Sequence, residues 1–389
     1  MIAKTLLGTF MVVFLSSPLN GQSKRTKKQD YPFTEKHWIT SSDNVQFFDY
    51  KSTKAVRSSN DESFELVLKD VDFSVGTIEF DVELKGMGFP GIIFHMNEET
   101  NNAETYYLRY FGKLDPFSRF TMQYAAVIDG INLWDLTDQY QAAASLTENE
   151  WNHIKMVISE HQMKVYVNDM SRAALHVPVL EGLHKSGKIS LNGNVIYSNF
   201  SITPNETENL ANTIGFDPTY NDPNYIRTWQ VQEPIEFATG KDPMRQIISN
   251  PGVVIDEAFF TPSKSWRTVE AKHRAMVNLT KEFGGTEMEK RRLTWLKTTI
   301  TSEKDQEKWL NMGFSDEVWV FINGQPLHQN KNYYGSPGMK EPRGRCTIDN
   351  TAFSVPLKQG ENEILIGLSN YFYGWGLIAR WEETSGLSY

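Results

Sequence analysis

Apolar and polar residues alternate along many short stretches of this chain. In residues 76–86, GTIEFDVELKG, every second position from Ile78 to Leu84 is apolar. Strict alternation over such a length predicts a half-buried β-strand whose apolar side chains share one face. Helical periodicity is scarce, whereas comparable runs recur between Gly, Pro, Asn and Asp residues, for example SFELVLKDVDF, GIIFHM, TYYLRYF and MKVYVND. The pattern therefore predicts an all-β protein of the sandwich or barrel type.

One segment interrupts the strand pattern and divides the chain. Residues 205–224, NETENLANTIGFDPTYNDPN, are polar and rich in turn-forming residues, which predicts a linker. The linker separates a first domain, residues 46–204, from a second domain, residues 225–389. Two domains suit a chain of 389 residues, because single hydrophobic cores stop growing at about 250–300 residues.

The N-terminus has the pattern of an export signal. Lys4 precedes an apolar run at residues 6–15, and small and turn-forming residues follow as far as Gly21. This predicts a signal peptide over residues 1–21, cleaved near Gly21, and hence a secreted or periplasmic protein. The run is too short to span a bilayer and no later stretch is long enough, so we expect no transmembrane segment in the mature chain. Residues 22–45 are expected to form an N-terminal tether and lead-in.

Charge and cysteine content narrow the choice of partners. The net charge is -9 and no basic stripe is present, which argues against nucleic acid as a partner. Cys346 is the only cysteine, so no internal disulfide can form, and a small buried apolar residue is expected. The eight histidines follow no metal-binding spacing, so we expect no metal centre and no cofactor. The loop at residues 97–104, NEETNNAE, could hold a structural Ca²⁺ through oxygen ligands; an acidic, solvated loop is the alternative.

The order of motifs in the first half resembles a known family. Over residues 47–203 the motifs are GTIEFDVELKG, FPGIIFHMNEETNNAETYYLRYF, QYAAVIDGINLWDL, WNHIKMVISEHQMKVYVND and GKISLNGNVIYSNFSI. This order is similar to the bacterial branch of the concanavalin A-like lectin/glucanase (laminin G-like) sandwiches. The positions that match the family's pattern are Gly91, Phe94, Glu104, Tyr107, Arg109, Gln123, Tyr124, Trp134, Trp151 and Phe200. That branch usually has Arg where this chain has His95. The resemblance implies a concanavalin-like antiparallel β-sandwich, and it leaves the activity open because the superfamily holds lectins, glycosidases, lyases and adhesion modules.

The second half resembles a galactose-binding-like jelly roll, a second β-sandwich. The motifs that carry this resemblance are WLKTTITS, DEVWVFINGQPLHQ, VPLKQGENEILIGLSN and GWGLIARWE. Such modules commonly accompany glycan-degrading enzymes. The loops of this half offer Tyr333, Tyr334 and Trp375 as rings that could stack on a sugar. A Trp375 that plugs the end of the sandwich is the alternative.

The strand at residues 76–86 also carries three carboxylates on one face, Glu79, Asp81 and Glu83. Glucanases of the laminarinase and agarase kind carry a similar Glu-x-Asp-x-Glu strand, in which the two Glu act as nucleophile and acid/base. Positions i and i+4 of a strand lie about 13 Å apart, whereas retaining hydrolysis needs carboxyl groups about 5.5 Å apart. The strand also comes earlier in the chain than in those enzymes. A solvated face of an antiparallel sheet is therefore the favoured interpretation, and a catalytic triplet is the alternative.

A second group of candidates is expected on the open face of the first sandwich. Alternation places Tyr107 and Arg109 on one side of their strand and puts His95 on the same face. Arginine binds carboxylate or sulfate through paired hydrogen bonds, and aromatic rings stack on sugars. The carbohydrate-binding candidates in this half are His95, Tyr107, Arg109, Gln123, Tyr124 and Trp134. A plain ladder of cross-strand pairs is the alternative.

These observations favour a secreted carbohydrate-binding protein that takes part in polysaccharide recognition or degradation. Its expected partner is a polysaccharide or oligosaccharide, acidic or sulfated. A glycoside hydrolase or polysaccharide lyase is the second hypothesis, with candidates His95, Glu104, Tyr107 and Arg109. In that case Tyr107 or His95 would be the acid/base and Arg109 would neutralise a uronate or sulfate. A protein-interaction or adhesion module is the third.

Overall fold

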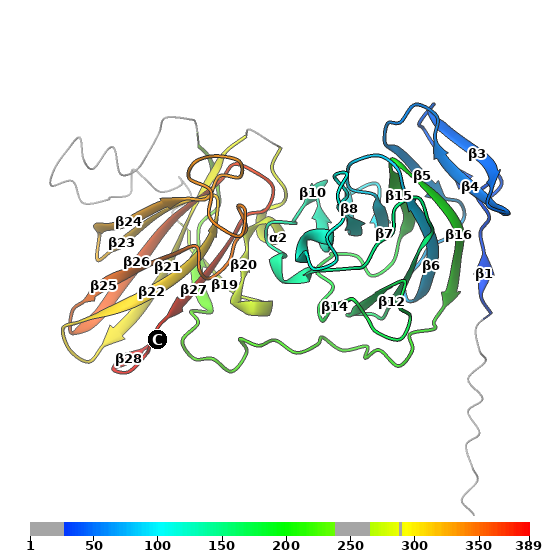
Figure 1. Ribbon diagram of the computed structural model, residues 1–389. Helices are drawn as coiled ribbons and strands as arrows, with labels where there is room; N and C mark the ends of the chain where they lie inside the picture. Colours follow the sequence, from blue (N-terminus) through cyan, green and yellow to red (C-terminus); the bar gives the residue numbers. More distant parts are fainter. Residues whose placement is uncertain (1–26, 238–264, 288–289) are drawn as a thin grey trace, which may run out of the picture.

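The computed structural model describes residues 27–237, 265–287 and 290–389. The predicted signal peptide, residues 1–21, lies outside the described residues. Figure 1 shows two β-sandwiches that follow one another along the chain, so the all-β prediction is confirmed. Within the described ranges, no helix has the length and apolar character that crossing a membrane requires.

The first sandwich has a back sheet and a front sheet. The back sheet consists of β14 (Leu175–Val177), β13 (Met163–Val167), β12 (Asn152–Ile158), β6 (Gly76–Leu84), β16 (Val195–Pro204), β4 (Thr53–Ser58) and β3 (Val45–Tyr50), with β1 (Gln29–Asp30) paired to β16. The front sheet consists of β10 (Ile131–Asn132), β9 (Met122–Ile128), β8 (Asn102–Leu108), β7 (Gly91–Asn97), β15 (Lys188–Gly193), β5 (Phe64–Leu68) and β2 (Trp38–Ile39), with β11 (Gln141–Ala142) paired to β9. Neighbouring strands pair antiparallel.

Alternation along the strands fills the space between these two sheets. Ile78, Phe80 and Val82 of β6 face Ile92 and Phe94 of β7, and all five are buried in one hydrophobic core. Side chains of the expected lead-in also belong to this core: they are Phe33 and Trp38. Residues 29–39 are therefore part of the sandwich and not only a tether.

The second sandwich begins after residues 205–227. Its larger sheet consists of β19 (Arg267–Glu270), β17 (Thr228–Val231), β21 (Arg292–Ser302), β26 (Gly360–Asn370), β23 (Glu317–Ile322) and β24 (Gln325–Lys331), with β18 (Ile235–Glu236) and β28 (Leu387–Ser388) paired to β21. Its smaller sheet consists of β20 (Val277–Asn278), β27 (Gly376–Trp381), β22 (Gln306–Ser315) and β25 (Thr351–Leu357). The described helical segments are α2 (Leu279–Phe283), η1 (Arg119–Thr121), η2 (Asp138–Tyr140) and η4 (His273–Ala275).

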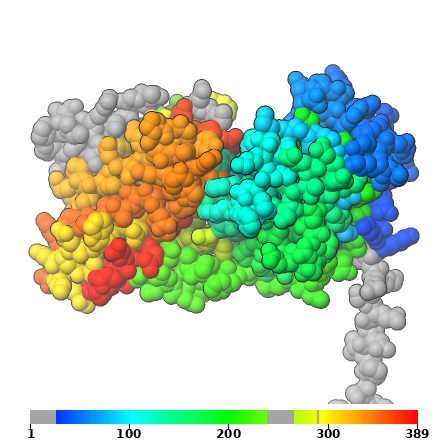
Figure 2. Space-filling model, viewed as in Figure 1, coloured from blue at the N-terminus to red at the C-terminus, as the bar shows by residue number. Residues whose placement is uncertain are grey.

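A separate hydrophobic cluster joins the two sandwiches. Ala126 and Leu136 of the first half pack there with Met276, Cys346 and Ile378 of the second. Cys346 is 3% exposed, which confirms the prediction of a small buried residue. In Figure 2 the cyan surface of the first half meets the orange surface of the second. Loops of the second half are thereby held against the edge of the front sheet.

Candidate functional site

Strand β8 and the residue that directly follows it present two candidate residues, Tyr107 and Arg109, to the outer face of the front sheet. Tyr106 and Leu108 point into the core, so Tyr107 and Arg109 take the opposite side, as alternation predicts. Tyr107 is paired in register with Gln123 on one side and Gly91 on the other. A Cβ atom on Gly91 would lie 2.7 Å from Tyr107 Cβ. The glycine therefore leaves room for the Tyr107 side chain on the face.

This outer face forms one wall of a cavity between the two halves. The cavity has a volume of about 660 Å³. From the first half it is lined by Phe89, Tyr107, Arg109, Phe111, Phe120 and Trp134, among others. From the second half it is lined by Tyr334, Arg343, Arg345, Phe372 and Tyr373. We call it the interdomain cavity. Its second-half residues come from the loop between β24 and β25 and the loop between β26 and β27.

Hydrogen bonds to neutral groups hold the Arg109 guanidinium in the interdomain cavity. Its Nη1 donates to the Phe120 carbonyl at 3.0 Å, and its Nη2 donates to the Tyr107 hydroxyl at 3.2 Å. Its Nη2 also donates to Gln123 Oε1, while Gln123 Nε2 donates to the Trp134 carbonyl at 2.7 Å. Gln123 is fully buried. It therefore positions Arg109 and does not itself face a ligand.

A second arginine, from the other half, approaches the first. Arg345 Nη2 donates to Gln141 Oε1 at 3.1 Å, and Arg109 Nη1 donates to the same oxygen at 3.3 Å. The Arg345 side chain is only 4% exposed, and its guanidinium carbon lies 4.8 Å from the centre of the Trp134 ring. Burial is the larger cause and repulsion from Arg109 the next, and together they lower the pKa of Arg345 to about 10. Two cations thus share one neutral acceptor.

The local carboxylates do not balance this positive charge. Asp138 lies 3.4 Å from Arg345 Nε, but it is also paired with Arg119 at 3.0 Å. Four cationic side chains line the interdomain cavity: Arg109, Lys113, Arg343 and Arg345. The lining contains one carboxylate, that of Asp115. An anion placed between the two guanidinium groups would receive charge-assisted hydrogen bonds, which are the stronger kind.

Aromatic rings supply most of the remaining wall. The Trp134 ring lies 5.1 Å from Tyr334 and 5.9 Å from Tyr373. On the first-half side, Phe89 lies 5.9 Å from Tyr107 and is 54% exposed. Exposed rings beside hydrogen-bonding groups suit a ligand with an apolar face and polar edges, as a pyranose has.

Two candidates predicted for the open face lie inside the sandwich. His95 is 1% exposed, and its Nδ1 lies 2.9 Å from Glu104 Oε1 while its Nε2 lies 2.7 Å from the Ser74 carbonyl. The register of β7 against β8 shifts between Phe94 and Asn97, and His95 has φ 51° there. This bulge turns His95 inward, so its predicted place beside Tyr107 is wrong.

Glu104 and Tyr124 belong to the same buried network. The Tyr124 hydroxyl donates to Glu104 Oε2, and it accepts a hydrogen bond of 2.6 Å from the Glu181 backbone N–H. Both side chains are 0% exposed. They take the inward side of their strands, opposite Tyr107 and Gln123. The predicted placement of Tyr124 on the binding face is therefore wrong.

The aromatic candidates of the second half separate into three environments. Tyr334 lines the interdomain cavity. Tyr333 instead donates its hydroxyl proton to Glu317 and packs 5.3 Å from Tyr371. Trp375 is fully buried in the core of the second sandwich, as the plug alternative proposes. Of these three rings, only Tyr334 can contact a ligand in this cavity.

The three carboxylates of β6 lie on the outer face of the back sheet. Glu79 is 2.9 Å from Lys28 Nζ, and Asp81 is 2.6 Å from His153 Nδ1. Glu83 is buried and pairs with Lys51 at 2.9 Å. Each carboxylate is thus occupied by a cation. The three carboxylates share one face of the strand as alternation predicts, but the prediction of a solvated face is wrong for Glu83, which is 0% exposed. The triplet lies on the sheet opposite the interdomain cavity.

The carboxylates around His153 lead to a prediction about its pKa. Hydrogen bonds that the protonated ring donates to the carboxylates, first to Asp81 and then to Glu79, raise the pKa of His153 to about 9. A His whose folded pKa exceeds its unfolded value of about 6.5 stabilises the fold below that value and loses this contribution as pH rises through about 9. An NMR titration should therefore place the His153 midpoint near 9. His176 is the matched control, because burial lowers its pKa; equal midpoints for the two residues would contradict the assignment.

Sequence reasoning missed several lining residues. Arg345 and Arg343 stand close together in EPRGRC, and this pair of cations in a Pro/Gly-rich loop is the signal that was available. Phe89, Phe111 and Phe120 gave no comparable signal. Among the described residues, no three His, Cys, Asp or Glu side chains group so that they could hold a metal ion. The calcium at residues 97–104 stays a prediction.

No family model and no curated protein matches this chain. Solved structures that resemble parts of it include a family 66 carbohydrate-binding module from Bacillus subtilis, with 17% identity, a TM-score of 0.32 and coverage of 42% of this chain and 91% of that one. A β-glucanase of Bacillus licheniformis has 12% identity, a TM-score of 0.33 and coverage of 48% and 100%. A family 35 carbohydrate-binding module from an environmental isolate has 14% identity, a TM-score of 0.19 and coverage of 24% and 68%. Likeness at this level does not define the ligand or activity of this chain.

Proposed function

We propose that this protein binds an anionic polysaccharide, one that carries carboxylate or sulfate groups, in the interdomain cavity. The observation that carries the proposal is the pair Arg109 and Arg345, which share the neutral Gln141 oxygen in a cavity with surplus positive charge. The aromatic wall around Trp134 gives the sugar ring a stacking surface. An exported location, which the N-terminal residues predict, would bring the site to such a polymer.

Binding to matched charged and uncharged ligands tests this proposal. Calorimetric titrations would use pectic oligogalacturonates and carrageenan oligosaccharides, each beside its carboxyl-reduced or desulfated form. We expect at least one anionic form to bind at least tenfold more tightly than its uncharged partner, because paired hydrogen bonds to guanidinium need the anion. Raising the salt concentration should weaken that binding, since salt screens the attraction.

One outcome would contradict the proposal, and another would add catalysis to binding. Equal affinity for the charged and uncharged forms would remove the role of the two arginines. New reducing ends or unsaturated products in the same mixtures would instead support the glycan-active enzyme hypothesis. In that case Tyr107, whose hydroxyl donates to Gln123 at 3.2 Å and accepts from Arg109, would be the first residue to replace.

A further inference from the structure

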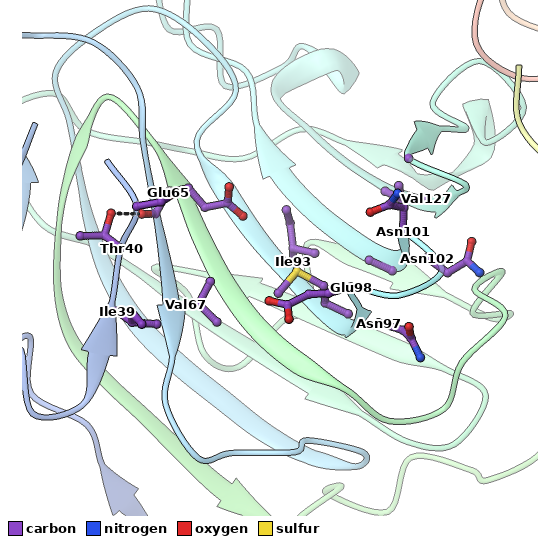
Figure 3. Close-up of a pocket in the computed structure, with 14 residues that line it drawn as sticks. Ile39, Thr40, Glu65, Val67, Ile93, Asn97, Glu98, Asn101, Asn102 and Val127 are labelled. Atoms are coloured by element: carbon purple, nitrogen blue, oxygen red, sulfur yellow. Dashed lines mark hydrogen bonds between the residues drawn. The ribbon is translucent and has the colours of Figure 1, made fainter. Parts of the chain in front are cut away.

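A second cavity lies on the outer face of the front sheet. Its volume is about 710 Å³. Figure 3 shows its lining, which comes from β2, β5, β7, β8 and β9 and the loop after β7. Ile93 and Val127 line both this cavity and the interdomain cavity. The two cavities are therefore adjacent parts of one surface, and we call the second one the sheet cavity.

The strand register explains why the sheet surface beneath the two cavities is continuous. Ile93 of β7 pairs with Thr105 of β8 on one side and Ser190 of β15 on the other. Ser190 in turn pairs with Val67 of β5. This row of side chains crosses four strands on the same face, from the interdomain cavity at Thr105 to the sheet cavity at Val67.

The two cavities differ in charge. Among the residues that line the sheet cavity, the charged side chains are two carboxylates, Glu65 and Glu98, and there is no lysine or arginine. Lys188 pairs with Glu98 at 2.5 Å from outside the lining. Glu65 Oε1 accepts a hydrogen bond of 3.0 Å from the Ser190 hydroxyl, which is a neutral donor. Glu65 thus leaves the sheet cavity with an excess of negative charge.

The remaining lining suits an uncharged sugar. Val67, Ile93 and Met96 are apolar, while Asn97 and Asn101 stand at the side with amide groups. Apolar surface accommodates the face of a pyranose, and amide and carboxylate groups can bind its hydroxyls. A carboxylate or sulfate beside Glu65 would be repelled, and like charges at an interface suppress the wrong partner.

We propose that the two cavities form one groove for a linear glycan in which anionic and uncharged sugars occur in the same chain. The anionic group lies between Arg109 and Arg345, and an uncharged sugar of the same chain lies over Val67 and Ile93 beside Glu65. This inference rests on the proposed function and adds the charge pattern of the ligand. A polymer with an anionic group on every sugar is disfavoured because it brings an anion to Glu65.

Charge reversal at Glu65 tests the groove. The probes are a homopolymer, oligogalacturonate, and an alternating uronate–N-acetylhexosamine glycan, a hyaluronan oligosaccharide of the same length. The wild-type chain should prefer the alternating glycan. In Glu65→Lys we expect affinity for the homopolymer to rise at least fivefold while affinity for the alternating glycan changes less than twofold. Glu361→Lys, at an exposed position of the second half, makes the same change in net charge away from the groove.

The outcomes separate this inference from the proposed function. If Glu65→Lys and Glu361→Lys behave alike, or if the wild-type chain prefers the homopolymer, the groove is overturned. The proposed function then still stands if Arg345→Met weakens binding of the anionic probe by about tenfold or more. If Arg345→Met leaves binding unchanged, the proposed function itself fails.

Ligand length provides a second test that needs no change of charge. Ile93→Trp places a large ring at the junction of the two cavities. It should weaken binding of a hyaluronan octasaccharide at least tenfold and leave a disaccharide within twofold of wild type, provided that the melting temperature is unchanged. Equal affinity of the wild-type chain for both lengths would overturn the groove.

Discussion

Replacing Arg345 with methionine should weaken binding of an anionic oligosaccharide by about 10- to 100-fold. Hydrogen bonds to charged groups contribute about 1.5–3 kcal/mol, and each 1.4 kcal/mol corresponds to a factor of ten in affinity. Methionine keeps an unbranched chain against the Phe120 and Trp134 rings while the cation is lost. Calorimetry with the best anionic ligand of the panel above measures the change.

Two further variants make the Arg345 result interpretable. Arg172→Met removes an exposed cation of the first half and should leave affinity within twofold. Arg345→Lys keeps the charge but loses the planar fork, so its affinity should lie between those of wild type and Arg345→Met. Equal loss of binding in Arg345→Met and Arg172→Met, with wild-type affinity in Arg345→Lys, would point to net charge and not to the paired guanidinium groups. An unchanged affinity in Arg345→Met would contradict the site.

The largest expected effect on stability concerns two buried carboxyl groups at the junction of the halves. Ser315 Oγ lies 3.1 Å from Asp135 Oδ2 and 2.9 Å from Asp316 Oδ1. A serine hydroxyl has one proton to donate, so one of the two carboxyl groups must be protonated to complete both hydrogen bonds. Burial raises the pKa of Asp135 to about 7. Burial and the proximity of Asp135 raise the pKa of Asp316 to about 8.

Asp316→Asn should therefore change how stability depends on pH. A carboxyl group whose folded pKa lies above its unfolded value of about 3.9 binds more proton in the folded state, so the free energy of unfolding falls as pH rises from about 4 to about 8. The asparagine variant should show a flatter fall and be about 1–3 kcal/mol more stable than wild type at pH 8, because a buried charge is removed. Its amide oxygen can still accept from the Tyr371 and Phe372 N–H groups, as Asp316 does.

Urea unfolding at pH 5, 6.5 and 8 measures this effect. Asp43→Asn, at an exposed position, is the matched control and should follow the wild-type curve. A wild-type protein whose stability rises from pH 5 to pH 8 would contradict the protonated pair. So would an Asp316→Asn variant that loses stability equally at all three values.

Local patterns predicted the strands and part of the site. Alternation on β8 placed Tyr107 and Arg109 on the outer face because Tyr106 and Leu108 supply the apolar side. The same rule failed for His95, since one bulge between Phe94 and Asn97 reverses the face and leaves no periodic signature. The role of Arg345 could not be predicted for another reason, because its contact with Gln141 joins residues 204 positions apart in the chain. No local pattern encodes which loops of one sandwich meet the edge of the other.

Both halves of the chain supply residues that line the interdomain cavity, and this has a consequence for modular engineering. Arg109 belongs to the first half and Arg345 to the second, and both donate to Gln141. A chimera that joined the first sandwich to a foreign partner would retain Arg109 but lose Arg345, the cation that faces it. The two halves must therefore be transplanted, or inherited by recombination, as one unit if ligand recognition is to survive the transfer.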